Sequence, residues 1–212
     1  MLEVGAGTGK LTSLLVPSGA RVIAVEPVEA MRRRLAADLP AVEVLEGAAE
    51  RLPLQDASVD AIVAAQAFHG FDGPRALAEF QRVMRPGATL ALIWNVRDER
   101  LEWVRKMSAL LERFEEGTPR HHHGIWKECF RDSAFEPLRL TTFPHVQRGS
   151  PEMVVDRVAS ISFIAALPET DRNRVLDEVR DILASSPETA GRSTVDLPYE
   201  TRVFTTTLRA SP

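Results

Sequence analysis

The sequence predicts an α/β protein in which a mostly parallel sheet is wound by helices on both faces. Three observations predict this fold class. Short apolar segments of strand character alternate with helical segments through the first half of the chain. Glycines stand at alternate positions directly after the first apolar segment, where a strand turns into a helix. An acidic residue ends the second apolar segment, where sheets of this class hold nucleotide-like ligands.

The first segment, Met1–Val4, leads directly into a loop with glycine at positions 5, 7 and 9. Because glycine has no Cβ, the backbone can turn tightly there and come close to a ligand. The spacing separates this loop from two others. A dinucleotide fingerprint needs glycine at position 10, where the chain has lysine, and a P-loop needs glycine at 4 and Ser or Thr at 11, where valine and leucine stand.

The next two elements extend this pattern. Lys10–Val16 is expected to form a helix whose first N–H groups face the ligand. Arg21–Glu26 is typical of a buried strand that ends in an acid, and Glu26 lies 19 residues after Gly7. A carboxylate at this place can accept hydrogen bonds from both hydroxyls of a ribose. The alternative is an ordinary exposed acid at a strand end.

Three more strands are expected before residue 95. The third strand is expected at Val42–Leu45, and a turn segment follows at Glu46–Leu54. The fourth strand and its exit loop are expected at Asp60–His69. A helix end and Pro-Gly turn at Arg82–Ala88 then lead into a fifth strand at Thr89–Trp94. In this order the features over residues 1–95 resemble the class I S-adenosylmethionine-dependent methyltransferases, in particular the methyltransferase type 11-like enzymes that act on small molecules.

The resemblance implies a Rossmann-like doubly wound fold and S-adenosyl-L-methionine as the cofactor. It assigns cofactor contacts to Glu3, Gly5, Ala6, Gly7, Thr8, Glu26, Pro27, Ala49, Gln66 and Ala67. The chain departs from the family pattern at Ala48, where family members usually carry an acid that binds the amine of adenine. The backbone N–H of Ala49 is then expected to serve a ring nitrogen of adenine.

His69 is the candidate catalytic residue, because it follows the fourth strand where family members present residues to the transferred methyl. A histidine there can act as a general base toward a hydroxyl, amine or acid. The alternative is a histidine that only shapes the pocket. No dedicated catalytic residue is needed when the nucleophile is already an anion, since alignment lowers the barrier by itself.

Two other readings of the first half stay open. A non-catalytic Rossmann-like relative is favoured by Ala48 and opposed by the glycines and Glu26. A nicotinamide-dependent oxidoreductase is opposed by Lys10. Family members normally carry helices before the first strand that cover the cofactor, whereas this sequence starts on the strand. We therefore expect a chain without those N-terminal helices and with weakened cofactor binding.

The second half predicts structural elements. They are a helix over Leu101–Phe114, an edge strand over Leu138–Phe143, a helix from Ser150 that buries Val154, Val155, Val158, Ile161 and Ile164, a helix over Pro168–Ala184, and a closing strand over Thr201–Leu208. The expected organisation is a cofactor-binding core at 1–148, a helical insertion at 149–190 and a final strand returning to the sheet at 191–212. The last strands form its antiparallel end pair.

Composition limits the function classes. The 212 residues are 44% hydrophobic, enough for a buried core, and the net charge of −4 argues against a nucleic-acid partner. A single cysteine, Cys129, excludes an internal disulfide, and no apolar run is long enough to cross a bilayer. These features predict a cytoplasmic protein that binds no membrane and takes a small-molecule substrate. Oligomeric state is not predicted.

The remaining conspicuous residues have two readings each. His121–His123 suggest a metal, but consecutive side chains do not converge on one ion, so no metal is expected. Arg97 is expected either to clamp a substrate carboxylate or to form a surface ion pair. Trp103, Trp126 and Phe163 are expected either to wall an apolar pocket or to pack in the core.

Overall fold

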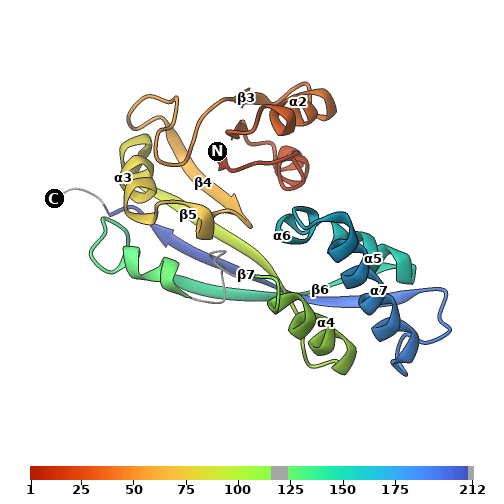
Figure 1. Ribbon diagram of the computed structural model, residues 1–212. Coiled ribbons are helices and arrows are strands. Elements are labelled where there is room, and N and C mark those ends of the chain that lie inside the picture. The colour runs from red at the N-terminus through yellow and green to blue at the C-terminus, as the bar shows by residue number, and fades with distance from the viewer. Residues whose placement is uncertain (116–123, 210–212) are drawn as a thin grey trace. The chain divides into compact units, whose positions relative to one another are not determined.

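The computed structural model describes residues 1–115 and 124–209 and contains a seven-stranded sheet in the order β3-β2-β1-β4-β5-β7-β6 (Figure 1). The first five strands in this order pair in parallel, and the end strands are antiparallel. The strands are β1 Leu2–Val4, β2 Ile23–Val25, β3 Glu43–Leu45, β4 Val59–Ala65, β5 Met84–Arg97, β6 Arg139–Gly149 and β7 Val195–Thr207. This confirms the predicted fold class.

Helices connect and flank these strands. The α-helices are α1 Thr12–Leu15, α2 Glu29–Asp38, α3 Gly73–Val83, α4 Glu102–Glu112, α5 Pro151–Ala159, α6 Ser162–Ala165 and α7 Glu169–Ser185, and the 3-10 helices are η1 Val16–Ser18, η2 Phe68–Gly70 and η4 Ile125–Phe130. The start of α3 illustrates their local logic. Its N-cap residue, Asp72, accepts a hydrogen bond from the N–H of Arg75 at 3.3 Å, and a proline follows in the first turn.

The register of the parallel strands brings four loops to one edge of the sheet. Val4 at the end of β1 pairs with Val25 at the end of β2, and Val25 pairs with Leu45 at the end of β3. β1 also pairs with β4. Because parallel strands end at the same edge, the segments that follow β1, β2, β3 and β4 meet there.

The described residues form two compact units. The first contains residues 1–94, 124–141 and 202–209, and the second contains residues 95–115 and 142–201. The core of the second unit is formed by α4, α5, α6 and α7 around Trp103, Met107 and Val179. The whole predicted insertion, 149–190, falls within the second unit. The predicted domain boundaries at 148 and 190 stay a prediction.

Several elements differ from their predicted extents. The fifth strand runs over Met84–Arg97, whereas a Pro-Gly turn was predicted within Arg82–Ala88 and a strand only at Thr89–Trp94. The first helix is Thr12–Leu15 instead of Lys10–Val16. It starts later than predicted, and it ends at Leu15 because Pro17 cannot donate the next hydrogen bond. The helix from Ser150 breaks into α5 and α6 at Ile161, whose backbone is extended with ψ of 128°. The last two strands are longer than predicted. For β7 the signal was the alternation of buried Val195, Leu197 and Tyr199, which precedes the predicted start.

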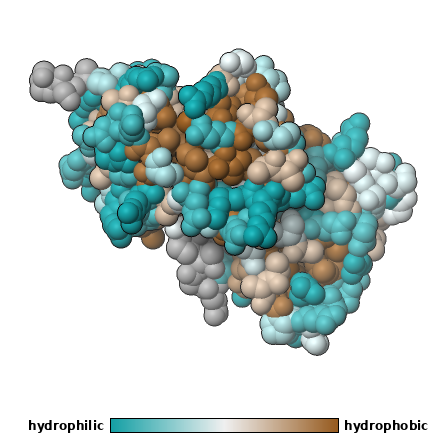
Figure 2. All heavy atoms as spheres, turned by 90° about the horizontal axis from the view of Figure 1, so that it is seen from above, coloured by the Kyte–Doolittle hydropathy of each residue, from teal (hydrophilic) through white to brown (hydrophobic). Residues whose placement is uncertain are grey.

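In the described part of the chain, no helix combines the length and apolar character needed to cross a membrane. Large apolar side chains are exposed at Leu14, Val16, Val28, Met31, Ile125, Leu140, Phe143 and Val146. Figure 2 shows hydrophobic residues exposed on the surface between hydrophilic ones.

Candidate functional site

The glycine loop after β1 is tied to its neighbours by backbone contacts. The N–H groups of Gly5 and Ala6 both donate to the carbonyl oxygen of Val25, at 2.9 and 3.2 Å. A Cβ placed on Gly5 would lie 2.8 Å from the Cβ of Ala67. The absence of a side chain at Gly5 therefore lets the loop lie directly against the segment that follows β4.

The other two glycines of this loop have different surroundings. Gly7 has a φ of +58°, and a Cβ there would meet no heavy atom within 4 Å in the described structure. A Cβ on Gly9 would lie 2.9 Å from Cγ of Leu35, on α2. Gly9 thus allows the loop to pack against a helix, while Gly7 borders open space where a ligand can approach the backbone.

Glu26 faces this loop from the end of β2. Its side chain is buried, and Oε2 accepts the N–H of Gly7 at 2.9 Å while Oε1 accepts the N–H of Val28 at 3.0 Å. These two bonds fix the orientation of the carboxylate. A carboxylate can accept about four hydrogen bonds, so each oxygen retains capacity for a hydroxyl donor. The predicted ribose acceptor is thus brought to the glycine loop.

Glu3 lies beneath the loop and is only 2% exposed. The hydroxyl of Thr12, at the start of α1, donates to its Oε2 at 2.6 Å. Burial raises the pKa of Glu3 to about 7. The observed partner of this carboxyl is therefore Thr12, which the sequence analysis did not identify, and cofactor contact by Glu3 stays a prediction.

The segment after β3 packs closely against the sheet. A Cβ on Gly47 would lie 3.1 Å from Cγ1 of Val25, and Ala48 forms an isolated antiparallel bridge with Arg51. Ala49 is only 3% exposed, which leaves little of its backbone accessible to a ligand. The adenine contact assigned to Ala49 stays a prediction.

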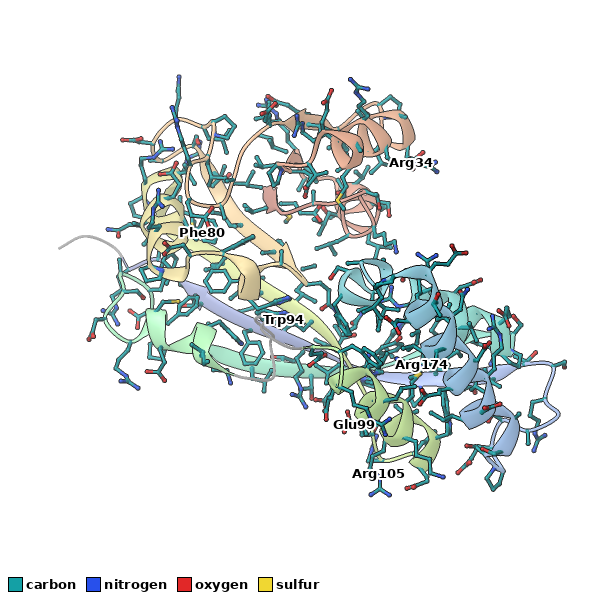
Figure 3. All side chains as sticks on the ribbon, viewed as in Figure 1. Arg34, Phe80, Trp94, Glu99, Arg105 and Arg174 are labelled. Atoms are coloured by element: carbon teal, nitrogen blue, oxygen red, sulfur yellow. The ribbon has the colours of Figure 1, made fainter. Side chains whose placement is uncertain are left out.

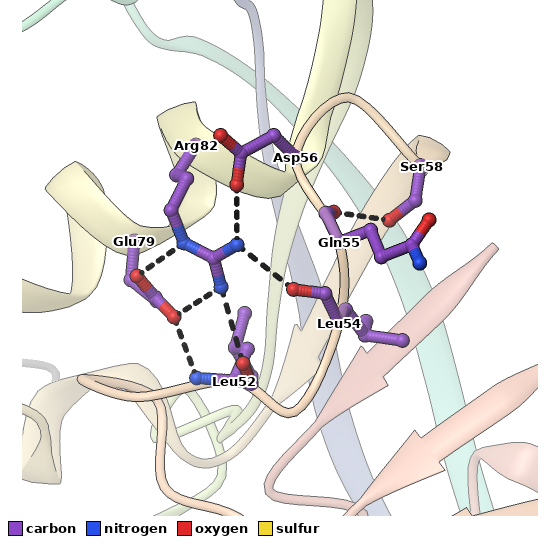
Figure 4. Close-up of polar contacts among 7 residues, drawn as sticks. All are labelled: Leu52, Leu54, Gln55, Asp56, Ser58, Glu79 and Arg82. Carbon is purple, nitrogen blue, oxygen red and sulfur yellow. Dashed lines mark hydrogen bonds and ion pairs between the residues drawn. The ribbon is translucent and has the colours of Figure 1, made fainter.

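Arg82 on α3 anchors the continuation of this segment (Figure 4). Its guanidinium donates to the carbonyl oxygens of Leu52 and Leu54 and to the carboxylates of Asp56 and Glu79. Glu79 in turn accepts the N–H of Leu52 at 2.7 Å. The hydrogen bond from Arg82 lowers the pKa of Glu79. This network fixes a loop that has no regular secondary structure of its own.

The segment after β4 begins with an unusual backbone conformation. Gln66 is a non-glycine residue with a φ of +56°, and its N–H donates to the carbonyl oxygen of Ile93 at 2.9 Å. Such conformations are costly and are found preferentially at functional sites. The sharp turn directs the chain toward Gly5 through Ala67 and places His69 beside β5.

His69 contacts a buried tryptophan. The indole Nε1–H of Trp94, at 1% exposure, donates to Nδ1 of His69 at 3.1 Å. In a neutral imidazole that accepts at Nδ1, the proton is on Nε2. His69 can then take a proton at Nδ1 only if Trp94 releases it. The general-base role of His69 stays a prediction under this condition.

The structure places the other predicted site residues in and around these loops. Ala6 is buried, whereas Thr8 and Pro27 are exposed beside Gly7 and Glu26 in sequence. All ten predicted contacts belong to the first unit.

Arg97 and the aromatic candidates of the sequence analysis contact other side chains of the protein. Nε of Arg97 donates to Oγ of Ser108 at 2.9 Å. Trp103 lies in the core of the second unit, with Phe163 packed at its margin, and Trp126 stacks 4.7 Å from Trp94. His121–His123 fall outside the described residues. Among the described residues no group of three or more potential metal ligands is found.

Comparisons with known proteins agree with this geometry. Residues 2–92 match the family model described as a methyltransferase domain. An uncharacterized methyltransferase of Mycobacterium tuberculosis is 41% identical over 208 residues, covering 98% of this chain and 83% of the relative. An uncharacterized methyltransferase-like protein of Schizosaccharomyces pombe is 35% identical over 205 residues, covering 96% of this chain and 80% of the relative.

A solved structure also covers nearly the whole chain. A protein of Anaeromyxobacter dehalogenans, provisionally described as a type II methyltransferase, superposes with a TM-score of 0.69 at 26% identity and covers 98% of this chain and 88% of that one. The sheet order, the glycine loop followed by Glu26, and these relatives lead to one conclusion. The chain belongs to the class I methyltransferase family.

Proposed function

We propose that this chain uses S-adenosyl-L-methionine to methylate an oxygen or nitrogen atom of a small molecule. The observation that carries the proposal is the buried Glu26 carboxylate, held against the glycine loop by the N–H of Gly7 at 2.9 Å. Membership in the family supplies the reaction class, and this geometry supports the cofactor.

The residues present fit this cofactor. The space beside Gly7 is open where a Cβ would point, so a ligand can lie against the backbone there. Glu26 would accept the ribose hydroxyls, and Gln66 and Ala67 would border the methionine end. Thr8 and Pro27, both exposed, would flank the ligand. Glu3, Ala6 and Ala49 are buried, and their contacts with the cofactor are part of this proposal.

When bound, S-adenosylmethionine supplies a methyl group on a positively charged sulfur. The chain's own contribution is to hold the donor and the acceptor in line, and such alignment can lower a barrier by about 7–11 kcal/mol. His69 would position the acceptor through Nε2–H while Trp94 holds Nδ1. To serve as a base at Nδ1, the imidazole would have to release Trp94 and turn Nδ1 toward the acceptor.

The acidic composition supports a small-molecule acceptor over a nucleic acid, and we propose the cytoplasm as the compartment. The second candidate is a relative that binds cofactor poorly and transfers no methyl. Ala48 favours it, because the family's acid at this position is replaced.

Calorimetric titration with S-adenosylhomocysteine tests the proposal. We expect the wild-type protein to bind, and Glu26→Gln to bind at least about tenfold more weakly, because the amide cannot accept from both Gly7 and Val28. Glu29→Gln is the matched control, since Glu29 is exposed and pairs with Arg33. Absence of binding by folded wild-type protein would refute the proposal. Labelled methyl transfer to small acids, phenols and amines then separates an active enzyme from the second candidate.

A further inference from the structure

The turn that carries Glu26 is held by an arginine whose role the reaction does not explain. Arg32 lies on α2, and its side chain is 15% exposed. Its Nη1 donates to the carbonyl oxygens of Glu26 and Pro27, at 3.0 and 2.6 Å. Its Nη2 donates to Oε2 of Glu46 at 2.8 Å. One guanidinium therefore binds two backbone carbonyls and a carboxylate.

These contacts join two segments of the candidate site. Glu26 and Pro27 form the turn after β2, and Glu46 is the first residue after β3. The strands behind them are in register, since the N–H of Glu26 donates to the carbonyl of Leu45 at 3.2 Å. Arg32 adds to this backbone bond by joining the carbonyls of Glu26 and Pro27 to the carboxylate of Glu46, beyond the ends of β2 and β3.

The contacts also act on the orientation of the Glu26 side chain. Its carboxylate is fixed by the N–H groups of Gly7 and Val28, and Val28 follows Pro27 directly. Arg32 holds the carbonyls on both sides of Pro27. The Pro27 carbonyl belongs to the same peptide unit as the Val28 N–H, so a shift of this turn would also move that N–H. The backbone N–H of Arg32 is itself anchored to the carbonyl of Val28 at 3.0 Å.

The neighbouring arginines provide a contrast. Arg33 pairs with Glu29, and Arg34 pairs with Asp38 at 2.7 Å, each within α2. Their side chains are 78% and 69% exposed, and Figure 3 shows Arg34 pointing outward from α2. Three consecutive arginines thus have the same chemistry, and Arg32 alone among them contacts the turn after β2 in the described structure.

We propose that Arg32 is a positioning residue for ribose recognition, which holds the Glu26 turn and couples it through Glu46 to the segment after β3. This inference rests on the proposed binding of S-adenosylmethionine. It predicts that the loss of Arg32 lowers affinity mainly through the ribose hydroxyls. A lysine cannot replace it, because a single ammonium cannot reach both carbonyls and the carboxylate with the fixed fork of a guanidinium.

The experiment compares S-adenosylhomocysteine with its 2′-deoxyribose counterpart by calorimetry. In the wild-type protein we expect the deoxy ligand to bind more weakly, since Glu26 loses a donor. We expect Arg32→Lys to bind S-adenosylhomocysteine about tenfold more weakly than the wild type, as removal of supporting residues commonly does. The difference in affinity between S-adenosylhomocysteine and its deoxy counterpart is expected to become smaller in this variant. Arg34→Lys, with the same chemical change on the same helix, is expected to bind both ligands as the wild type does.

A second variant covers a loss of folding in Arg32→Lys. Glu46→Gln changes a side chain that is 77% exposed, so the fold is expected to persist. We expect this variant to bind S-adenosylhomocysteine about twofold to threefold more weakly than the wild type and to show a smaller difference between the two ligands. Equal weakening of both ligands in Arg32→Lys would overturn the inference, because it indicates a general structural role. Wild-type affinity in Arg32→Lys would also overturn it. No binding by the wild-type protein would instead refute the proposed function on which it rests.

Discussion

The indole Nε1–H of Trp94 donates a hydrogen bond of 3.1 Å to Nδ1 of His69. This bond joins β5 to the 3-10 helix that follows β4, so it links the ends of two neighbouring strands of the sheet. Trp94 is 1% exposed and packs against Trp126 and Phe204, which leaves the indole one orientation. The tautomer of His69 is therefore set by a side chain of the core.

Trp94→Phe tests this relationship. The variant keeps an aromatic ring but has no N–H, so Nδ1 loses its donor and the imidazole no longer favours the Nε2–H form. We expect the wild-type nitrogen NMR signals to report Nε2–H and those of the variant to report a mixture. The free energy of unfolding is expected to fall by about 1–3 kcal/mol. A wild-type signal from Nδ1–H would contradict the assignment.

Gly7→Ala and Gly9→Ala test whether each glycine is needed for ligand binding or for packing of the loop against α2. Alanine at Gly7 meets no neighbour but is strained at φ +58°, so we expect a stability loss of about 1 kcal/mol and affinity for S-adenosylhomocysteine reduced at least about tenfold. Alanine at Gly9 also collides with Leu35, and we expect a loss of about 2–4 kcal/mol. Thermal denaturation and calorimetry measure the two effects. Unchanged affinity in Gly7→Ala would remove Gly7 from the site.

Glu3→Gln is expected to change how stability depends on pH. The pKa of Glu3 is raised from 4.5 to about 7, so the folded protein keeps this proton up to a higher pH than the unfolded chain does. Stability therefore falls as the pH rises from about 4.5 to about 7, by about 3 kcal/mol from this group. Glutamine can still accept from Thr12 and carries no charge.

Urea denaturation at several pH values checks this expectation. The stability of Glu3→Gln relative to the wild type should increase across this range and level off above it. Parallel curves for the two proteins would show that Glu3 is not buried as described.

Arg82→Gln tests the network that anchors the loop after β3. The carbonyls of Leu52 and Leu54 and the Glu79 carboxylate lose donors, so we expect a loss of about 1–3 kcal/mol in urea denaturation. Because Arg82 lowers the pKa of Glu79, the difference should shrink as the pH falls through the carboxyl range.

Arg85→Gln is the control for this network. Arg85 pairs with Asp60 at a site where both side chains are at least half exposed, so we expect a change below about 1 kcal/mol. Equal losses in Arg82→Gln and Arg85→Gln would show that the network adds nothing beyond a surface ion pair.

The fold class, the glycine loop and the acid Glu26 were predictable from the sequence. The glycine spacing and the acid at Glu26 are local signals, because each depends on residues within one strand-to-loop junction. The structure brings Gly7 and Glu26 together by a hydrogen bond that the sequence analysis did not predict. The succession of five strands along residues 1–95 followed from the same alternation of strands and helices, whereas their order in the sheet, β3-β2-β1-β4-β5, came from the structure.

Side-chain partners could not be predicted in this way. No motif identifies Thr12 as the partner of Glu3, Arg32 as the partner of the Glu26 turn or Trp94 as the partner of His69. The partners of Arg32 and Trp94 lie in segments that follow strands of the sheet. Arg32 also could not be told from Arg33 and Arg34, since all three have the same side chain and adjacent positions. Only the orientation of α2 against the sheet selects one of them.

The sequence by itself therefore determined the kind of sheet, the site of the glycine loop and the acid that faces it, because backbone geometry at these junctions depends on local residue type. The tertiary structure decided which donor each buried polar group meets, which nitrogen of His69 carries the proton, and the raised pKa of Glu3. The reason is physical: hydrogen bonding and burial depend on which elements pack together, and residues distant in sequence supply both the partners and the low-dielectric surroundings.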